Sequence, residues 1–445
     1  MKEVINKLKQ AVKNTKFENH TFLVGGFVRD QLMERTSDDI DIVVDLPNGG
    51  IELSELLYKK GISSRPVIYR NFGTALTVID GVNIELVMTR KESYRNNSRK
   101  PQVKPATLKE DAQRRDFTIN AIYQNLVTEE IFDLTGKGIS DIKDKIIRTV
   151  IDADKVFNED PLRMLRAVKF AVKLNFLIEE STYLSLKNNA YRLEIISVER
   201  IKEEFIKIIT SNKPGLGIKM LIDTDLMNYI IPEFKEILDV PQNKYHNLNV
   251  LEHTIKVVEN VKPTPILRIS ALLHDIGKGR TYFKDENGDI HFHKHEVVGA
   301  KMAVKILNRL RFSNKFIKEV EFLIRNHLRT KQYGKNAELV TDKTIRRLIL
   351  NSGDYLEDLL ALIDADNKVH APEYSMPNQI SNLKMRIKSI ENKMETMPIS
   401  GDDIKERFNL KEGKLIGEYL SKAKEKWLEN PQISKEELLE YLKSS

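Results

Sequence analysis

The sequence predicts an α+β domain at the amino terminus, followed by an all-α remainder. Up to about residue 138, short apolar runs alternate with short helical patterns, and from Ile139 onward apolar residues recur almost wholly at helical spacing. A chain of 445 residues is also too long for a single core. We therefore expect four domains, over residues 1–138, 139–240, 241–375 and 376–445.

The first domain begins with an apolar run, Phe22-Leu-Val24, which ends at Gly25-Gly26. This run predicts a strand, and residues 27–33 predict the helix that follows it. Three further strands are expected, over residues 40–44, 75–79 and 82–88.

The helical region offers one clear helix start at Asp160-Pro161, because Asp is a favoured N-cap and Pro fits the first helical position. Leucines and valines from Leu162 to Val172 form its apolar stripe, so we expect Arg163, Arg166 and Lys169 on the exposed surface. Prolines 232 and 241 and the segment 372–377 are expected near domain boundaries, with amphipathic helices from there to the end.

Composition excludes several classes of protein. The chain has 41% hydrophobic and 31% charged residues, which is typical of a folded globular protein. It contains no cysteine, so disulfides, zinc–thiolate sites and cysteine nucleophiles are excluded. No apolar run approaches membrane-spanning length and no apolar signal core follows Met1, so we expect a cytoplasmic protein without a membrane partner.

Asp39-Ile-Asp41 is the first candidate site. Residues i and i+2 of a strand point to the same face, so the two carboxylates can converge on one cation. A lone Asp-x-Asp is usually an ordinary polar turn, but here Gly25-Gly26 ends a strand just upstream, where backbone N–H groups can approach a phosphate. Carboxylates that hold Mg²⁺ suit phosphoryl transfer, so we predict that Asp39 and Asp41 form a catalytic metal site.

The pattern Gly25-Gly-Phe-Val-Arg29-Asp30 followed by Asp39-x-Asp41 resembles the class II tRNA nucleotidyltransferases, which include CCA-adding enzymes and bacterial poly(A) polymerases. Their head domain is similar to that of DNA polymerase beta, and an all-α neck, body and tail follow it. The resemblance implies two Mg²⁺ ions in the head, ATP and CTP as substrates, and tRNA as partner. The chain departs from the family at Met33-Glu34, where Leu-Gly is common.

The resemblance also implies a set of nucleotide-binding residues. Asp160 and Arg163, within Glu159-Asp-Pro-Leu-Arg, would read the Watson–Crick edge of the incoming base, since a carboxylate accepts from the amine that C and A share. The alternative role for Asp160 is to cap the helix. The alternative role for the arginines at Arg114-Arg115 is to complement the dipole at a helix end. The full predicted set is Gly25, Gly26, Arg29, Arg115, Asp116, Asn120, Asp160, Arg163 and Arg166.

A basic segment lies between the two groups of motifs. From Met88 to Arg115 there are nine Lys and Arg residues against three Asp and Glu, without a strong hydrophobic period. A solvated loop is one explanation, and a mobile basic strip facing RNA phosphates is the other. The candidate RNA-binding residues are Arg90, Lys91, Arg95, Arg99 and Lys100.

The second half contains a different constellation, since seven of the nine histidines fall between residues 246 and 327. His253, His274-Asp275 and Asp366 follow the order of the HD phosphohydrolase superfamily, which they resemble; Asp364 is the alternative to Asp366. His295 and His327 are further candidate ligands, and His291 and His293 are expected in loops. Imidazole and carboxylate donors suit Mg, Mn, Ni or Fe.

We therefore expect a tRNA nucleotidyltransferase that adds CCA from CTP and ATP, with a possible phosphohydrolase activity in the HD domain. CC addition alone, A addition alone and poly(A) synthesis are the alternatives within the family. An HD phosphohydrolase whose head only binds RNA is the alternative of another class. Glu85 is a candidate third carboxylate of the head site.

Overall fold

The computed structural model describes residues 1–37, 39–93, 102–243, 245, 247–392 and 396–444, and it divides into two compact units, Met1–Phe234 and Lys235–Ser445. The predicted α+β head and all-α remainder are confirmed. The four finer domain ranges remain a prediction.

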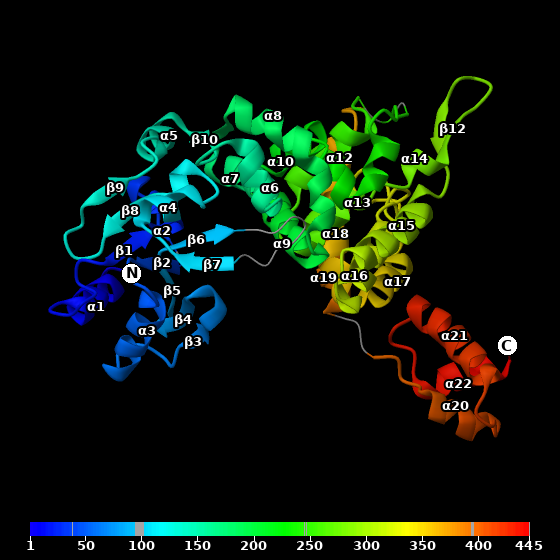
Figure 1. Cartoon of the computed structure of the whole chain (residues 1–445). Coiled ribbons are helices and arrows are strands. Elements are labelled where there is room, and N and C mark those ends of the chain that lie inside the picture. Colours follow the sequence, from blue (N-terminus) through cyan, green and yellow to red (C-terminus); the bar gives the residue numbers. More distant parts are fainter. Residues whose placement is uncertain (38, 94–101, 244, 246, 393–395, 445) are drawn as a thin grey trace. The chain divides into compact units, whose positions relative to one another are not determined.

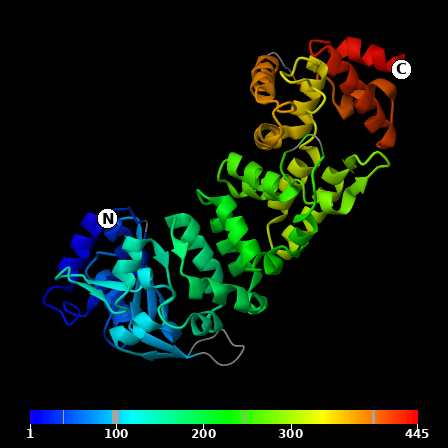
Figure 2. The same cartoon turned by 90° about the horizontal axis from the view of Figure 1, so that it is seen from above.

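The first unit contains a mixed seven-stranded sheet in the order β3-β4-β5-β2-β1-β8-β9, in the blue-to-cyan part of Figures 1 and 2. Strands β2 and β5 are parallel, and the other neighbours are antiparallel. The predicted strands are all present, each within a residue of its expected start. The sheet strands are β1 (Thr21–Val24), β2 (Asp39–Val44), β3 (Val67–Tyr69), β4 (Thr74–Ile79), β5 (Val82–Met88), β8 (Ile122–Asn125) and β9 (Ile131–Asp133).

One face of this sheet carries the core of the head. Helices α1 (Lys2–Val12) and α3 (Gly49–Lys59) supply Leu8 and Leu57 to a cluster with Ile40, Ile42 and Leu86 of the strands. Because side chains alternate along a strand, the odd-numbered residues of β2 and β5 stand on the other face. The head's other helices are α2 (Gly26–Leu32) and α4 (Leu108–Gln113).

The basic segment is more regular than the expected loop. Strands β6 (Arg90–Ser93) and β7 (Gln102–Pro105) pair as an antiparallel ribbon, and the Thr107–Glu110 capping box begins α4. The two strands are held by backbone hydrogen bonds between them, so they form although the side chains of this segment show no strong hydrophobic period.

Helices from α5 onward complete the first unit. Helix α7 begins at Leu162, with Pro161 as its N-cap, one residue later than expected. Asp160 still accepts a hydrogen bond from the Leu162 N–H at 3.2 Å. The remaining elements are α5 (Gly138–Asp144), β10 (Ile146–Ile147), α6 (Ala153–Glu159), α7 (Leu162–Leu174), β11 (Leu177–Ile178), α8 (Glu180–Asn189), α9 (Val198–Ile209), α10 (Pro214–Asp223) and α11 (Met227–Ile230).

In its described residues, the second unit is helical apart from one hairpin, formed by β12 (Tyr282–Lys284) and β13 (Ile290–Phe292). His291 therefore lies in a strand, and its predicted loop position is wrong. The helices are α12 (Val250–Asn260), α13 (Pro265–Leu273), α14 (Lys278–Thr281), α15 (His295–Arg309), α16 (Asn314–Asn326), α17 (Asp342–Ser352), α18 (Leu356–Val369), α19 (Gln379–Glu391), α20 (Gly401–Phe408), α21 (Lys414–Glu429) and α22 (Lys435–Lys443).

Candidate functional sites

Three carboxylates stand on the open face of the head sheet. Asp41 of β2 is in register with Glu85 of the parallel strand β5, and Asp39 lies two residues before Asp41. All three line one surface pocket with residues of β4 and β5. Burial, together with the charges of Glu85 and Asp39, raises the pKa of Asp41 to about 6. A cluster of oxygen donors that repel one another is the chemistry that a hard cation such as Mg²⁺ satisfies.

The glycine turn lies directly against Asp41. Strand β1 ends at Val24, and Gly25 has φ +71° and ψ −136° before α2 begins at Gly26. A Cβ on Gly25 would stand 2.9 Å from Oδ2 of Asp41. Both the backbone angles and the space therefore require glycine here.

A chain of polar groups, buried except for Arg166, extends from α2 to α7. Arg29 donates to Oδ1 of Asn120 at 2.8 Å, and Asn120 in turn donates to Asp116 at 3.1 Å. Asp116 also pairs with Arg166, at 2.6 Å, and this guanidinium helps hold the pKa of the Asp116 carboxyl well below its usual range against the opposing effect of burial. Arg29 and Arg166 both lie over the ring of Phe170, at 5.2 and 5.3 Å.

Arg115 is held by a second set of contacts, which joins the first where Nη1 of Arg115 donates to the carbonyl of Asn120 at 3.4 Å. It donates from Nε to the Tyr123 hydroxyl at 3.0 Å, and it lies 3.3 Å from the buried carboxylate of Asp111. Its guanidinium also approaches Gly25, since Nη1 would be 3.7 Å from a Cβ there. These contacts fix a cation beside the glycine turn and Asp41.

Asp160 and Arg163 lie at the start of α7. Arg163 donates to the carbonyls of Arg114 and Val156, at 2.5 and 3.3 Å, and pairs with Glu159 at 3.1 Å. Asp160 pairs with Arg200 of α9 at 3.0 Å. These bonds use three of the five N–H groups of Arg163 and give its guanidinium one defined orientation.

The expectation that α7 keeps its basic residues exposed is wrong for two of them. Arg163 and Lys169 are each only 8% exposed. Arg163 is buried because backbone carbonyls accept from it, and Lys169 because Glu204 of α9 pairs with it at 2.8 Å. Lys169 also stands 4.4 Å over Phe170, and its burial lowers its pKa to about 8.

The basic segment is described only at its ends. Arg90 donates to the carbonyl of Phe72 at 2.7 Å, and Lys91 pairs with Glu110 at 3.3 Å. Arg95, Arg99 and Lys100 lie outside the described residues.

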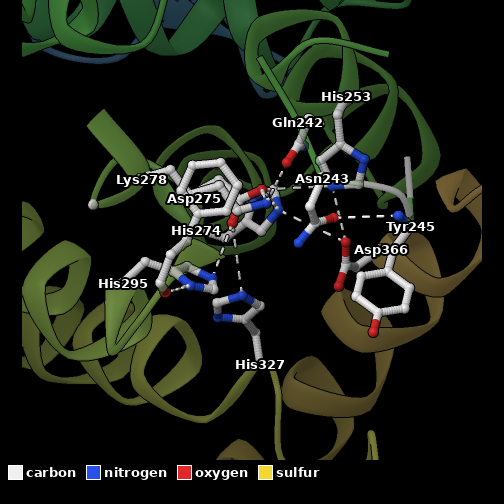
Figure 3. A network of polar contacts seen from close by, with 12 residues as sticks. Gln242, Asn243, Tyr245, His253, His274, Asp275, Lys278, His295, His327 and Asp366 are labelled. Atoms are coloured by element: carbon white, nitrogen blue, oxygen red, sulfur yellow. Dashed lines mark hydrogen bonds and ion pairs between the residues drawn. The ribbon is translucent and has the colours of Figure 1, made fainter. Parts of the chain in front are cut away.

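The predicted HD residues come together in the second unit (Figure 3). Asp275, at the end of α13, lies 3.2 Å from Nε2 of His274, and its other oxygen lies 3.3 Å from His295 and 3.9 Å from His327. Two groups of three possible ligands result, and Asp275 belongs to both: His253, His274 and Asp275, and Asp275, His295 and His327. A carboxylate shared by two groups is the arrangement that a pair of metal ions uses.

Asp366 of α18 closes this cluster. Its Oδ1 lies 2.9 Å from His253 and 3.8 Å from His274, and the residue is only 3% exposed. Asp364 instead pairs with Lys368 at 2.6 Å. The structure therefore favours Asp366 over Asp364 as the acidic partner of the cluster.

The histidines are oriented as metal ligands usually are. The Nδ1 atoms of His274, His295 and His327 each contact a backbone carbonyl, at 2.8, 2.9 and 2.7 Å. If each Nδ1 donates, each Nε2 presents a lone pair to the cluster. In the described part of the chain, the buried Nε2 atoms of His274 and His295 make no well-aligned hydrogen bond, although each lies within 3.3 Å of an Asp275 oxygen. Unsatisfied buried donor atoms of this kind fit a metal site.

Electrostatics within the cluster agree with this. Although burial opposes ionisation, His274 and Lys278 hold the pKa of Asp275 well below its usual range. Burial and the neighbouring histidines lower the pKa of His327 far below that of a free imidazole. Although burial opposes it, the charges of Asp275 and Asp366 raise the pKa of His274. The ionised Asp275 and the neutral His327 are in the protonation states that bind a metal, and an ion would have to displace any proton on His274.

Several residues of these sites were not predicted. Lys278 lies 2.7 Å from Asp275 and 3.0 Å from Gln242. Its position three residues after Asp275, one helical turn away, was a usable signal. The contacts of Phe170 with Arg166 and Lys169 lie within α7 and are local. The contact of Phe170 with Arg29 joins distant segments, and a single sequence carries no signal for it. The pairing of Arg200 with Asp160 at 3.0 Å, between residues 40 positions apart in sequence, was not predicted either.

Comparisons with known proteins agree with both halves of the structure. The model of the poly A polymerase head domain matches residues 21–148, that of a probable RNA- and SrmB-binding site of polymerase A matches 175–238, and the HD domain matches 244–359. No described helix is long and apolar enough to cross a membrane.

Three curated relatives carry related names. The A-adding tRNA nucleotidyltransferase of Deinococcus radiodurans is 29% identical over 71% of this chain and 74% of its own length. The CCA-adding enzyme of Pediococcus pentosaceus is 36% identical over 56% of this chain and 60% of its own. That of Staphylococcus haemolyticus is 36% identical, over 59% and 64%. The chain thus spans less than two thirds of the length of these two CCA-adding enzymes.

Solved structures share the fold along the whole chain. The CCA-adding enzyme of Bacillus stearothermophilus in complex with CTP has a TM-score of 0.72 at 21% identity, covering 100% of this chain and 96% of that one. The Thermotoga maritima enzyme complexed with tRNA has a TM-score of 0.62 at 22% identity, over 99% and 94%. Matches to the head, the RNA-binding segment and the HD domain occur in one chain, in that order. The chain therefore carries a poly A polymerase head domain, a segment similar to the RNA-binding site of polymerase A, and an HD domain.

Proposed function

We propose that this protein adds CCA to the 3′ end of tRNA from CTP and ATP, without a nucleic-acid template. One observation carries the proposal: Asp41 lies against the Gly25 turn, with Asp39 and Glu85 on the same face of the sheet. The names of the relatives and of the solved structures, which include complexes with CTP, ATP and tRNA, support this substrate set.

Asp39 and Asp41 would hold two Mg²⁺ ions, which when bound neutralise triphosphate charge and favour ionisation of the attacking hydroxyl. The 3′-oxygen of the RNA forms a bond to the α-phosphorus, and the bond from that phosphorus to the β-phosphate oxygen breaks, releasing pyrophosphate. Backbone N–H groups at Gly25-Gly26 and the guanidinium of Arg115 lie where they can bind the triphosphate.

Base selection falls to Asp160 and Arg163 in this proposal. Arg163 retains N–H groups beyond those given to Arg114, Val156 and Glu159, and Asp160 offers carboxylate oxygens beside it. The pair can donate to and accept from the edges of C and A, whereas G and U present other patterns. The Asp160–Arg163 pair would be positioned relative to the glycine turn by the polar chain of Arg29, Asn120, Asp116 and Arg166.

The test supplies tRNA lacking its 3′ end, and tRNA ending in CC, with CTP, ATP or both, and sequences the products. We expect CC from CTP alone and CCA from both nucleotides. Addition only to the CC-ended tRNA would identify an A-adding enzyme, addition of CC alone a CC-adding enzyme, and long A tails a poly(A) polymerase. Each of these outcomes would contradict the proposal.

A second activity is proposed for the cluster in the second unit, because its buried imidazole and carboxylate atoms fit a metal pair. His253, His274, Asp275, His295, His327 and Asp366 would hold Mg, Mn, Ni or Fe, and a bound ion would supply an activated water for hydrolysis of a phosphate ester. Release of phosphate by the metal-loaded protein, and its loss in Asp275→Asn, is the test. Unchanged release in that variant would contradict the assignment.

A further inference from the structure

The hairpin β12–β13 begins beside the metal-binding cluster. It follows α14, which carries Lys278 at its start, and it ends three residues before His295 of α15. In both views the hairpin extends beyond the helices around it (Figures 1 and 2). The base of the hairpin therefore lies next to the cluster, and its tip lies in solvent.

The two faces of the hairpin differ. Tyr282 is paired with Phe292, and Phe283 with His291, so the two pairs lie on opposite faces. Phe292 is buried and contacts the cluster: its ring lies 6.5 Å from that of His295 and 5.2 Å from Nζ of Lys278. Tyr282 packs 6.1 Å from Phe292, on the cluster side of the hairpin.

Tyr282 is 42% exposed, although its neighbour Phe292 is buried. A partly exposed aromatic ring that lies two ring contacts from a candidate phosphate-binding site can stack on the flat part of a ligand bound there. Nucleobases stack on tyrosine without regard to sequence, and a phosphate and its base are separated by one ribose.

We infer that Tyr282 stacks on the nucleobase of the phosphate ester bound at the His/Asp cluster, so that this site selects nucleotides over other phosphate esters. The inference rests on the phosphohydrolase function proposed above. The ligand is a free nucleotide or the terminal nucleotide of an RNA, which share this chemistry.

Charge on the hairpin limits how much of a nucleic acid it can bind. From Lys284 to Asp289 the hairpin tip has three carboxylates and one ammonium. A longer phosphate backbone across this tip would be repelled. The structure thus favours contact with a single nucleotide next to the cluster, and not a strand laid along the hairpin.

The test compares adenosine 5′-monophosphate with ribose 5-phosphate, which differ only in the base. Phosphate release by the full-length Mn²⁺-loaded protein is measured for both. We expect Tyr282→Ala to raise KM for the nucleotide at least fivefold, since loss of base stacking has effects of about five- to 150-fold. KM for ribose 5-phosphate and both kcat values should not change, and Tyr282→Phe should behave as the parent does.

Phe283→Ala is the matched control, because Phe283 is the adjacent aromatic residue, 56% exposed, on the opposite face. It should leave KM unchanged. An equal effect of the two alanine variants, or an equal rise in KM for both substrates, would overturn the inference. An effect on a short 5′-phosphorylated RNA but not on the mononucleotide would support it and identify the RNA end as the ligand.

A binding measurement separates this inference from the proposed hydrolysis. Photolabelling with 8-azidoadenosine 5′-monophosphate, mapped by mass spectrometry, should mark peptide 282–292 in the parent and in Phe283→Ala, but not in Tyr282→Ala. Labelling of this peptide without phosphate release would contradict the proposed phosphohydrolase activity and would still support the contact between Tyr282 and the base. Absence of label from this peptide in the parent would refute the base contact, whatever the hydrolysis results.

Discussion

Gly25→Ala should impair nucleotide addition by more than its effect on the stability of the head explains. The φ of +71° and ψ of −136° at Gly25 are disfavoured for alanine by about 1–3 kcal/mol. The new Cβ would also stand 2.9 Å from Oδ2 of Asp41, so the carboxylate must move by a few tenths of an ångström. Displacement of a catalytic group on this scale should lower kcat/KM for nucleotide addition about 10- to 100-fold.

Gly61→Ala is the matched control. Gly61 has nearly the same φ, +68°, and also lies in the head, but a Cβ there would meet nothing within 4 Å. Both variants should lower the unfolding midpoint of the head in urea, whereas only Gly25→Ala should slow CTP addition to tRNA lacking its 3′ end. Full activity in Gly25→Ala, or an equal loss of activity in both, would refute the reasoning.

Three further predictions follow from the site contacts. Asp41→Asn should abolish addition yet stabilise the metal-free head by about 2–3 kcal/mol at about pH 7.5. Because the pKa of Asp41 is raised to about 6, the ionised carboxylate destabilises the folded head above that pH. The stabilisation by Asp41→Asn, measured by urea unfolding, should therefore disappear near pH 4, where folded Asp41 is protonated. Equal stabilisation at about pH 4 and about pH 7.5 would contradict this. Arg163→Ala should relax the preference for CTP and ATP over UTP and GTP in competition assays, and an unchanged preference would remove its role in base selection. Asp275→Asn should lower the metal content of the purified protein, measured by mass spectrometry, whereas Asp364→Asn should not; equal metal loss would reject the proposed ligand set.

Much of the head could be predicted because its strands are short apolar runs and the first half of β2 alternates. In β2, Ile40, Ile42 and Val44 face the core, so the sequence placed Asp39 and Asp41 on the opposite face. The parallel pairing of β2 with β5 could not be read in the same way, because it joins residues more than 40 positions apart. Glu85 was therefore a weak candidate in the sequence, whereas the register puts it beside Asp41.

The errors on α7 have a single physical cause. Helical periodicity predicts which residues can face solvent, but a charged side chain can be buried when another segment satisfies it. Glu204 of α9 satisfies Lys169, and the carbonyl of Arg114 satisfies Arg163. Neither partner is near α7 in sequence, so no local pattern could indicate them.

Both proposed sites contain features that folding alone would disfavour. In the head, Gly25 adopts a backbone conformation that is disfavoured for other residues, and the half-buried Asp41 stands beside two further carboxylates. In the second unit, buried nitrogens of His274 and His295 make no well-aligned hydrogen bond in the described part of the chain. A head that only binds RNA would gain nothing from repulsion around Asp41, because RNA phosphates would be repelled as well. Bound cations would relieve the unfavourable interactions at both sites. We therefore infer that the chain carries two metal centres of different donor chemistry, and not one metal centre beside an inactive site.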